Sequence, residues 1–367
     1  MTIESGRAGD HSSSDTRKFP FVRPTDEQAS ELPVIDVSAL RRGTKSVSVA
    51  GEIDAACRET GFFYVVGHGV SPELVARVDR LAREFFALPE VEKASIAMRH
   101  GGRAWRGWFP LRGELTSGVP DQKEGLYFGE ELGPEDPRVW ASLPLHGANL
   151  FPARPEGLRD AVLEYMDALT EVGHRVLRGI SLALGLDDRW FDEHLTAAPT
   201  VLFRIFRYPP VAREEAESNV EWSVGEHTDY GLLTLLAQDD AGGLEVHTRA
   251  GWIAVPPIAD AFVVNLGDML ERMTGGRYRS TPHRVRNTGA RDRLSLPLFL
   301  DPAWDAEVLP VPHVVAHDDV DDSDSDADSD ADRWDGVSVH DWSGTYGDYL
   351  LAKVAKVFPV LRNDVIV

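Results

Sequence analysis

The chain has little cysteine, no long apolar run and a shortage of positive charge. Its 367 residues include one cysteine, Cys57, which excludes an internal disulfide and a thiolate metal cluster. Any metal must therefore be held by histidine and carboxylate side chains, and we expect a cytoplasmic protein. No run approaches the roughly 20 apolar residues that a membrane-spanning helix needs, so we expect no membrane association.

The shortage of positive charge bears on the choice of partner. The 38 Lys and Arg residues stand against 60 Asp and Glu residues, which gives a net charge of -22. Such a surface repels nucleic acid and anionic membranes. Nine aspartates lie between Asp318 and Asp332, and without them the charge would be -13. We therefore expect a small-molecule substrate and no nucleic acid, while the sequence leaves the oligomeric state open.

Composition and periodicity divide the chain into six segments. Two of them are polar or aspartate-rich and are predicted to be disordered, because they contain too little apolar surface to form a core. The remaining segments alternate between helical and strand-like periodicity. In chain order the predictions are a disordered leader at 1–30, an N-terminal region at 31–150, a helical support at 151–196, a strand-rich domain at 197–304, an acidic disordered insertion at 318–335, and a C-terminal helix and tail at 336–367.

Two kinds of periodicity predict the fold class. Apolar residues at helical spacing predict helices over Val47–Thr60, Ser71–Leu88 and Pro155–Leu184, and shorter ones over Asp268–Thr274 and Gly344–Val357. Short apolar runs separated by Gly, Pro and Asp predict strands, namely Leu32–Ile35, Phe62–Val66, Val201–Tyr208, Leu232–Gln238, Leu244–Val246, Trp252–Val255, Ala261–Leu266 and Leu294–Leu300. Many short strands in the second half favour a mixed α and β protein with a jelly-roll core flanked by helices.

Three side chains in the strand-rich domain are candidate metal ligands. His227 and Asp229 are separated by one residue, so on an extended segment both side chains point the same way. His283 begins another extended stretch that can supply a third ligand. Two imidazoles and one carboxylate occupy one face of a metal, which is the arrangement suited to iron(II) and oxygen chemistry. Zinc with a bound water, as in a hydrolase, remains an alternative at this point.

Arg293 and Ser295 follow ten and twelve residues after His283 and lie on one side of a predicted strand. A guanidinium can hold a carboxylate with two parallel hydrogen bonds, and a serine hydroxyl can add a third. Tyr208 ends a separate strand and is a further candidate donor. This carboxylate-binding pair disfavours a hydrolase, since a metal-bound hydroxide needs no such clamp beside it.

Candidate residues for substrate binding are fewer. Arg204 precedes Tyr208 by four residues, so the two share a strand face, and Arg204 can hold an acidic group if Tyr208 faces the cavity. Phe299 is a second candidate. Arg106, Glu114, Lys123 and Glu124, from the segment between the two halves, which we expect to be a loop, are weaker ones.

With these residues in place, the chain resembles the isopenicillin N synthase-like family of iron(II)/2-oxoglutarate-dependent oxygenases. The resemblance covers about Leu32 to Pro359. Its motifs are Leu32-Pro33-Val34-Ile35-Asp36, Gly61-Phe62-Phe63, Gly67-His68-Gly69, His227-Thr228-Asp229-Tyr230-Gly231, Gly242-Gly243-Leu244, Asn265-Leu266-Gly267-Asp268, Ser280-Thr281-Pro282-His283-Arg284-Val285 and Arg293-Leu294-Ser295.

The resemblance implies a distorted double-stranded β-helix and a set of roles. His227, Asp229 and His283 become the iron(II) ligands, and Arg293 with Ser295 becomes the anchor for 2-oxoglutarate, assisted by Tyr208. The implied reaction consumes dioxygen and most often hydroxylates a small metabolite, releasing succinate and carbon dioxide. A 2-oxoglutarate-independent oxidase, in which Arg293 and Ser295 bind the substrate's own carboxylate, remains an alternative, as do a zinc hydrolase and a non-catalytic jelly-roll binding protein.

Overall fold

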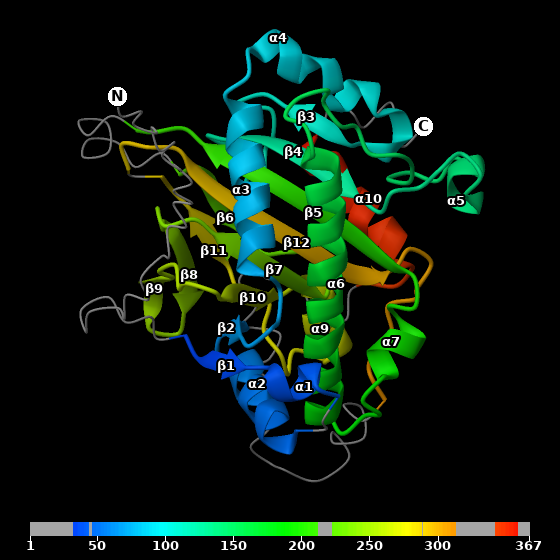
Figure 1. The fold of residues 1–367 in the computed structure, drawn as a ribbon. Coiled ribbons are helices and arrows are strands. Elements are labelled where there is room, and N and C mark those ends of the chain that lie inside the picture. The colour runs from blue at the N-terminus through cyan, green and yellow to red at the C-terminus, as the bar shows by residue number, and fades with distance from the viewer. Residues whose placement is uncertain (1–31, 44–45, 212–221, 288, 313–341, 359–367) are drawn as a thin grey trace, which may run out of the picture.

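The computed structural model describes residues 32–43, 46–211, 222–287, 289–312 and 342–358. The predicted leader at 1–30 and the predicted acidic insertion at 318–335 lie outside these ranges. Two layers of β-sheet, with helices around them, make up the described part (Figure 1). Within it no helix has the length and apolarity required to cross a bilayer.

The larger sheet has eight strands and draws on both halves of the chain. Its neighbouring strands are antiparallel except for the first pair, which is parallel. In spatial order they are β1 (Val34–Asp36), β2 (Phe62–Val66), β10 (Phe262–Leu266), β7 (Leu233–Gln238), β12 (Arg293–Ala303), β5 (Pro199–Tyr208), β4 (Glu124–Gly129) and β3 (Gly107–Phe109).

The smaller sheet has four antiparallel strands, in the order β6 (Val224–His227), β11 (His283–Val285), β8 (Leu244–Thr248) and β9 (Gly251–Ala254). Side chains of both sheets line one cavity of about 1010 Å³, measured out to its open mouth. The two sheets therefore face each other across it. The predicted mixed α and β class with a jelly-roll core is confirmed.

Strands β5 and β12 position the cavity residues, because one face of each strand lines the cavity and the other packs in the core. Successive side chains of a strand point to opposite faces. From Leu202 to Tyr208 and from Arg293 to Asp301 every second residue lines the cavity, and most of those between are buried on the opposite face. The cavity side has Leu202, Arg204, Phe206 and Tyr208 on β5 and Arg293, Ser295, Pro297, Phe299 and Asp301 on β12; the opposite side has Phe203, Ile205, Leu294, Leu296, Leu298 and Leu300.

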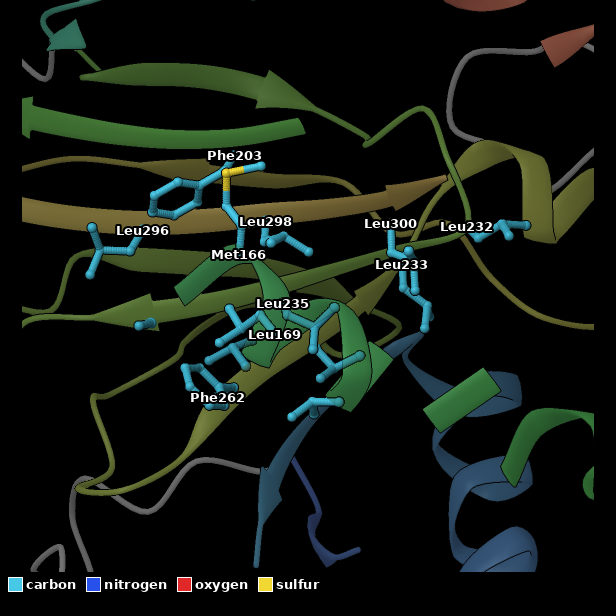
Figure 2. Close-up of a cluster of buried hydrophobic side chains, with 14 of the residues drawn as sticks. Met166, Leu169, Phe203, Leu232, Leu233, Leu235, Phe262, Leu296, Leu298 and Leu300 are labelled. Carbon is cyan, nitrogen blue, oxygen red and sulfur yellow. The ribbon is translucent and has the colours of Figure 1, made fainter. Parts of the chain in front are cut away.

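Helix α6 (Leu158–Ala183) covers this opposite face of the large sheet (Figure 1). Figure 2 shows Met166 and Leu169 of the helix within the cluster of buried leucines and phenylalanines contributed by the strands. Gly173 allows a close approach of the helix to the sheet, because a Cβ there would lie 2.6 Å from Leu300 Cδ2. The core on this side holds β5 and β12 in place, and with them the cavity-facing residues.

The remaining helices surround the sheets. Helices α2 (Val47–Glu59) and α3 (Pro72–Phe86) pack against α6 and begin at serine N-caps. Helix α10 (Tyr346–Val357) contributes Leu350, Val354 and Val357 to the cavity wall. The others are short: α1 (Ser38–Arg41), α4 (Glu90–Lys93), α5 (Pro137–Trp140), α7 (Trp190–His194), α9 (Asp268–Met273) and three 3-10 turns at Ala94–Ile96, Met98–His100 and Gly102–Ala104.

The main difference from the sequence prediction is the segment between the two halves, which we expected to be a loop. It contains β3 and β4, and β4 pairs with β5 along its whole length. The strand is hard to recognise because it begins with a buried glutamate, Glu124, and contains two glycines. Strands are predicted from β-branched and aromatic runs, and buried charge and glycine both lower that signal.

Candidate metal centre and cosubstrate pocket

The three predicted metal ligands come together at one end of the small sheet. His227 of β6 and His283 of β11 are direct partners in the antiparallel register, and their ring centroids lie 4.2 Å apart. Asp229 follows β6, in the turn before β7. One donor atom from each of the three side chains lies within 4.8 Å of the other two. The side chains thus converge on one point in the cavity.

Each imidazole is held by a backbone carbonyl. His227 Nδ1 lies 2.8 Å from Gly225 O, and His283 Nδ1 lies 3.2 Å from Thr281 O. Because a carbonyl oxygen only accepts, Nδ1 carries the proton and Nε2 keeps the lone pair. Burial, followed by the proximity of His283, lowers the pKa of His227 well below its usual range. His227 is therefore neutral at physiological pH, as a metal ligand must be.

The carboxylate of Asp229 is oriented by two neighbours. Thr234 Oγ1 donates to Oδ2 at 2.5 Å, and Asn265 Nδ2 donates to the same oxygen at 2.7 Å. Burial opposes ionisation, but attraction to the two imidazoles and these two hydrogen bonds outweigh it, so the pKa of Asp229 is lowered. The other oxygen, Oδ1, lies 3.9 Å from His283 Nε2 and is directed to the convergence point.

This donor set fits a divalent transition metal. Two neutral nitrogens and one anionic oxygen converge from one side, and the cavity opens on the other. A metal bound there would keep open positions for a cosubstrate, and the set is the one that non-haem iron(II) oxygenases use. Hydrogen bonds behind each ligand fix its direction, as a built metal site requires.

Arg293 lies in the same cavity, at the start of β12. It is 1% exposed, and its Cζ lies 4.7 Å from the centroid of the Tyr208 ring. Its Nε donates to Gly242 O, and Nη2 lies 3.5 Å from Gln238 Oε1. Among the described residues Nη1 has no hydrogen-bond partner although it is buried. A buried, unpaired guanidinium nitrogen indicates a position for an anionic ligand.

Ser295 and Tyr208 lie beside Arg293 in this part of the cavity. The Tyr208 hydroxyl and Ser295 Oγ are 3.2 Å apart, and both residues line the cavity. Sequence reasoning missed the two groups that hold Arg293, Gln238 and the Gly242 carbonyl. Gln238 ends the predicted strand Leu232–Gln238, but its pairing with Ser295 is given only by the fold, and a carbonyl contact carries no side-chain signal.

The predicted substrate residues Arg204 and Phe299 also line the cavity. Arg204 Cζ lies 4.8 Å from the centroid of Phe299 and 4.2 Å from that of Tyr127. Burial opposes its charge, but Tyr127 and Glu114 more than compensate, so the pKa of Arg204 is raised. Lys123 and Glu114 are cavity residues as well, paired with each other at 2.9 Å.

Two of the weaker candidates have other roles. Arg106 is used by the backbone, since its guanidinium donates to the carbonyls of Glu130, Gly147 and Leu145. Glu124 pairs with Lys93 at 2.7 Å and with Arg207 at 2.6 Å. Both are buried structural charges, and buried charges in proteins are usually paired in this way.

A jelly roll with two imidazoles, a carboxylate and a buried arginine facing one cavity defines the class of non-haem metal oxygenases. The family model described as the 2OG-Fe(II) oxygenase superfamily matches residues 199–302. A second, described as the non-haem dioxygenase in morphine synthesis N-terminal, matches residues 32–154. The chain belongs to the 2OG-Fe(II) oxygenase superfamily, whose typical metal and cosubstrate are iron(II) and 2-oxoglutarate.

Known proteins similar to this chain agree with that assignment. A probable iron/ascorbate oxidoreductase from Dictyostelium discoideum is 45% identical over 92% of this chain and 97% of its own. A homoarginine-6-hydroxylase from Arabidopsis thaliana is 35% identical over 76% of this chain and 87% of its own. The crystal structure of a full-length Neurospora crassa protein, in complex with alpha-KG and 5-formyluracil, has a TM-score of 0.71 and 26% identity, covering 89% of this chain and 98% of its own.

Membership in this family decides between the alternatives that the sequence left open. The chain is a non-haem iron(II)/2-oxoglutarate dioxygenase-family enzyme, which replaces the zinc hydrolase and the non-catalytic binding protein. The names of the relatives differ in what they act on, so they do not identify a substrate for this chain.

Proposed function

We propose that this enzyme hydroxylates a C–H bond of a small metabolite while 2-oxoglutarate and dioxygen are converted to succinate and carbon dioxide. In this balance one oxygen atom enters the substrate and the other enters succinate. The observation that carries the proposal is the pairing, in one cavity, of the three metal donors with an arginine whose buried Nη1 has no partner within the described chain.

Each residue has a separate part in this proposal. His227, Asp229 and His283 hold iron(II), which supplies the redox chemistry that activates dioxygen. Arg293 and Ser295, with Tyr208 beside them, bind the far carboxylate of 2-oxoglutarate and so fix its direction toward the metal. Pro297 and Phe299 of β12, with the apolar residues of α10, line the cavity and would limit the access of water to the reacting groups.

One experiment tests the metal and the cosubstrate together. Anaerobic addition of iron(II) and 2-oxoglutarate to the wild-type protein should produce a weak visible charge-transfer band. His227→Ala should lose both metal binding and the band. Arg293→Ala should bind the metal and need at least about tenfold more 2-oxoglutarate, because it loses charge-assisted hydrogen bonds to a carboxylate. The matched control is Arg291→Ala, an exposed cation two residues away that pairs with Asp240.

The 2-oxoglutarate-independent oxidase is kept as the second candidate because of one relative's name, the probable iron/ascorbate oxidoreductase. If this chain is such an oxidase, Arg293 and Ser295 bind the substrate's own carboxylate. The discriminating measurement is succinate release. If substrate is oxidised with no 2-oxoglutarate present and no succinate appears, the oxidase replaces our proposal.

A further inference from the structure

A second arginine of the cavity, Arg204, lacks the hydrogen bonds that its burial demands. Its side chain is 17% exposed and lines the cavity. Its Nε is buried without a partner, and no hydrogen bond joins its guanidinium to any of the residues that the structure describes. Glu114 Oε1 is the nearest carboxylate oxygen, at 3.7 Å from Nη1. A desolvated guanidinium with open donors is costly unless a ligand or water completes it.

The guanidinium is nevertheless held firmly. Tyr127, Arg204 and Phe299 belong to three neighbouring strands, β4, β5 and β12. Tyr127 and Arg204 are register partners, and the two rings lie 4.2 and 4.8 Å from Arg204 Cζ. Aromatic rings hold a guanidinium through its faces, whereas its N–H groups point outward in its plane. This contact therefore fixes Arg204 and leaves its hydrogen-bonding edge available.

Lys123, the other cation in this part of the cavity, is already paired with two carboxylates. Its ammonium lies 2.9 Å from Glu114 Oε2, 2.8 Å from Asp121 Oδ2 and 3.3 Å from Thr116 Oγ1. The contacts with Asp121 and Thr116 are hydrogen bonds and the contact with Glu114 is an ion pair, so the charge of Lys123 is already matched by two carboxylates. Glu114 forms an ion pair with Lys123 and accepts a hydrogen bond from Tyr127, and at 3.7 Å from Arg204 Nη1 its carboxylate makes no direct hydrogen bond to Arg204.

Arg204 is also well separated from the cosubstrate anchor. Arg293 pairs across the sheet with Tyr208, which is four residues beyond Arg204 on β5. Four residues of strand span roughly 13 Å. A ligand group on Arg204 therefore lies in a different part of the cavity from one on Arg293. Phe299, whose ring contacts Arg204, is the register partner of Thr234, which donates to Asp229, so this part of the cavity is on the metal side.

We propose that Arg204 binds the substrate and that the substrate carries a carboxylate. A carboxylate presents two acceptor oxygens that match the guanidinium edge, to which Glu114, 3.7 Å away, makes no hydrogen bond. This inference rests on the proposed function, since it assumes that Arg293 is occupied by 2-oxoglutarate. It names the substrate class as small carboxylic acids whose reacting C–H bond reaches the metal while the carboxylate is on Arg204.

The test uses a panel of small monocarboxylic acids, each paired with its primary amide. Both are titrated anaerobically into the wild-type iron(II)–2-oxoglutarate complex, and the change in the visible band reports binding without turnover. We expect at least one acid to bind about tenfold or more tightly than its amide, because only the acid makes two charge-assisted bonds. If no acid in the panel binds more tightly than its amide, the proposal is wrong.

Two variants assign the effect to this residue. Arg204→Met should remove the preference for acid over amide, and Arg204→Lys, which keeps the charge without the planar edge, should retain part of it. Both should keep the 2-oxoglutarate affinity of the wild type. The matched control is Arg207→Met, on the same strand but the other face, where Arg207 pairs with Glu124 and Asp292; its preference should be unchanged.

The outcomes separate this inference from the proposed function. No visible band in the wild type would remove the proposed function, and with it the basis of this inference. A normal band with an acid preference that survives Arg204→Met would overturn only the role of Arg204. A loss of 2-oxoglutarate affinity in Arg204→Met, with acid binding unchanged, would place Arg204 in the cosubstrate site instead.

Discussion

At the scale of single residues, the metal site depends on how one carboxylate is aimed. Asn265 and Thr234 both donate to Asp229 Oδ2, which leaves Oδ1 toward the two imidazoles. Groups of this kind are not ligands, yet they set the direction of the ligand. The Asp229 carboxylate is thus oriented by residues of β7 and β10, two strands of the large sheet.

We expect Asn265→Leu to weaken metal binding by about 10- to 100-fold, because Asp229 loses one of its two orienting hydrogen bonds. Titration of the protein with cobalt(II), followed by absorbance, measures this affinity. The control is Asn149→Leu, an equally buried asparagine that bonds to Gly129 and Glu131. An Asn265→Leu protein with wild-type affinity would show that Thr234 alone suffices.

Asp301 gives a pH dependence of stability. Burial raises its pKa to about 7 from an ordinary 3.8, with a further rise from Asp229 and an opposing hydrogen bond from Tyr346. The folded protein thus binds a proton that the unfolded chain releases at lower pH. This contribution to the free energy of unfolding is present at about pH 4 and is lost as the pH rises to about 7.

Asp301→Asn removes this proton equilibrium and keeps a neutral side chain at the position. Relative to the metal-free wild type, the variant should gain stability between pH 5 and pH 8, by at most about 1.4 kcal/mol per pH unit. Urea unfolding of both proteins at the two pH values measures the difference. A difference that is the same at pH 5 and pH 8 would contradict the assignment.

At the scale of elements, the sequence predicts helices and strands that have a clear apolar pattern and misses those that do not. The periodicity of Leu158–Ala183 predicts α6, and alternation along β5 and β12 predicts which of their residues share a face. Strands β6 and β11 have four and three residues, too few for any periodicity. His227 and His283 were still found because motif spacing, and not strand pattern, identified them. Strand β4 was missed because its buried Glu124 has partners, Lys93 and Arg207, that only the fold supplies.

Two helical glycines should respond in opposite ways to alanine. In Gly173→Ala the new Cβ would lie 2.6 Å from Leu300 Cδ2, so we expect a loss of about 1–3 kcal/mol through overpacking of α6 on the sheet. In Gly51→Ala on α2, where a Cβ would meet nothing within 4 Å, we expect a gain of about 0.5–1 kcal/mol. Chemical denaturation measures both, and equal shifts of one sign would contradict the packing argument.

At the scale of the whole molecule, the metal site joins the two sheets. His227 and His283 belong to the small sheet, whereas Asp229 is held by Thr234 and Asn265 of the large one. A metal bound to all three therefore binds only the folded arrangement, and such binding stabilises the fold by mass action.

A divalent metal should raise the melting temperature of the metal-free protein. At a metal concentration a hundredfold above Kd, the free energy of unfolding should increase by about 2.7 kcal/mol. His283→Ala should lose this rise. His247→Ala should keep it, because His247 is an exposed residue of β8 in the same sheet. Thermal unfolding monitored by circular dichroism, with and without chelator, makes the comparison; an unchanged rise in His283→Ala would remove His283 from the ligand set.

The limits of prediction at this scale are physical. Motif spacing could indicate the metal ligands and Arg293, because residue type and spacing alone are enough to suggest what these side chains bind. The sequence could not show that the Arg204 guanidinium lacks hydrogen-bond partners in the described structure. That property depends on side chains from β4 and β12 and on the loop that contains Glu114. The segmentation into an N-terminal region, a helical support and an oxygenase domain stays a prediction.

The alternation along β5 and β12 constrains how this enzyme can change. Inserting or deleting one residue in either strand would exchange inner for outer side chains, bringing leucines into the cavity and turning Arg293 or Arg204 against α6. New specificities in such a scaffold must therefore arise by replacing side chains at fixed positions, while length variation is confined to the connections between strands.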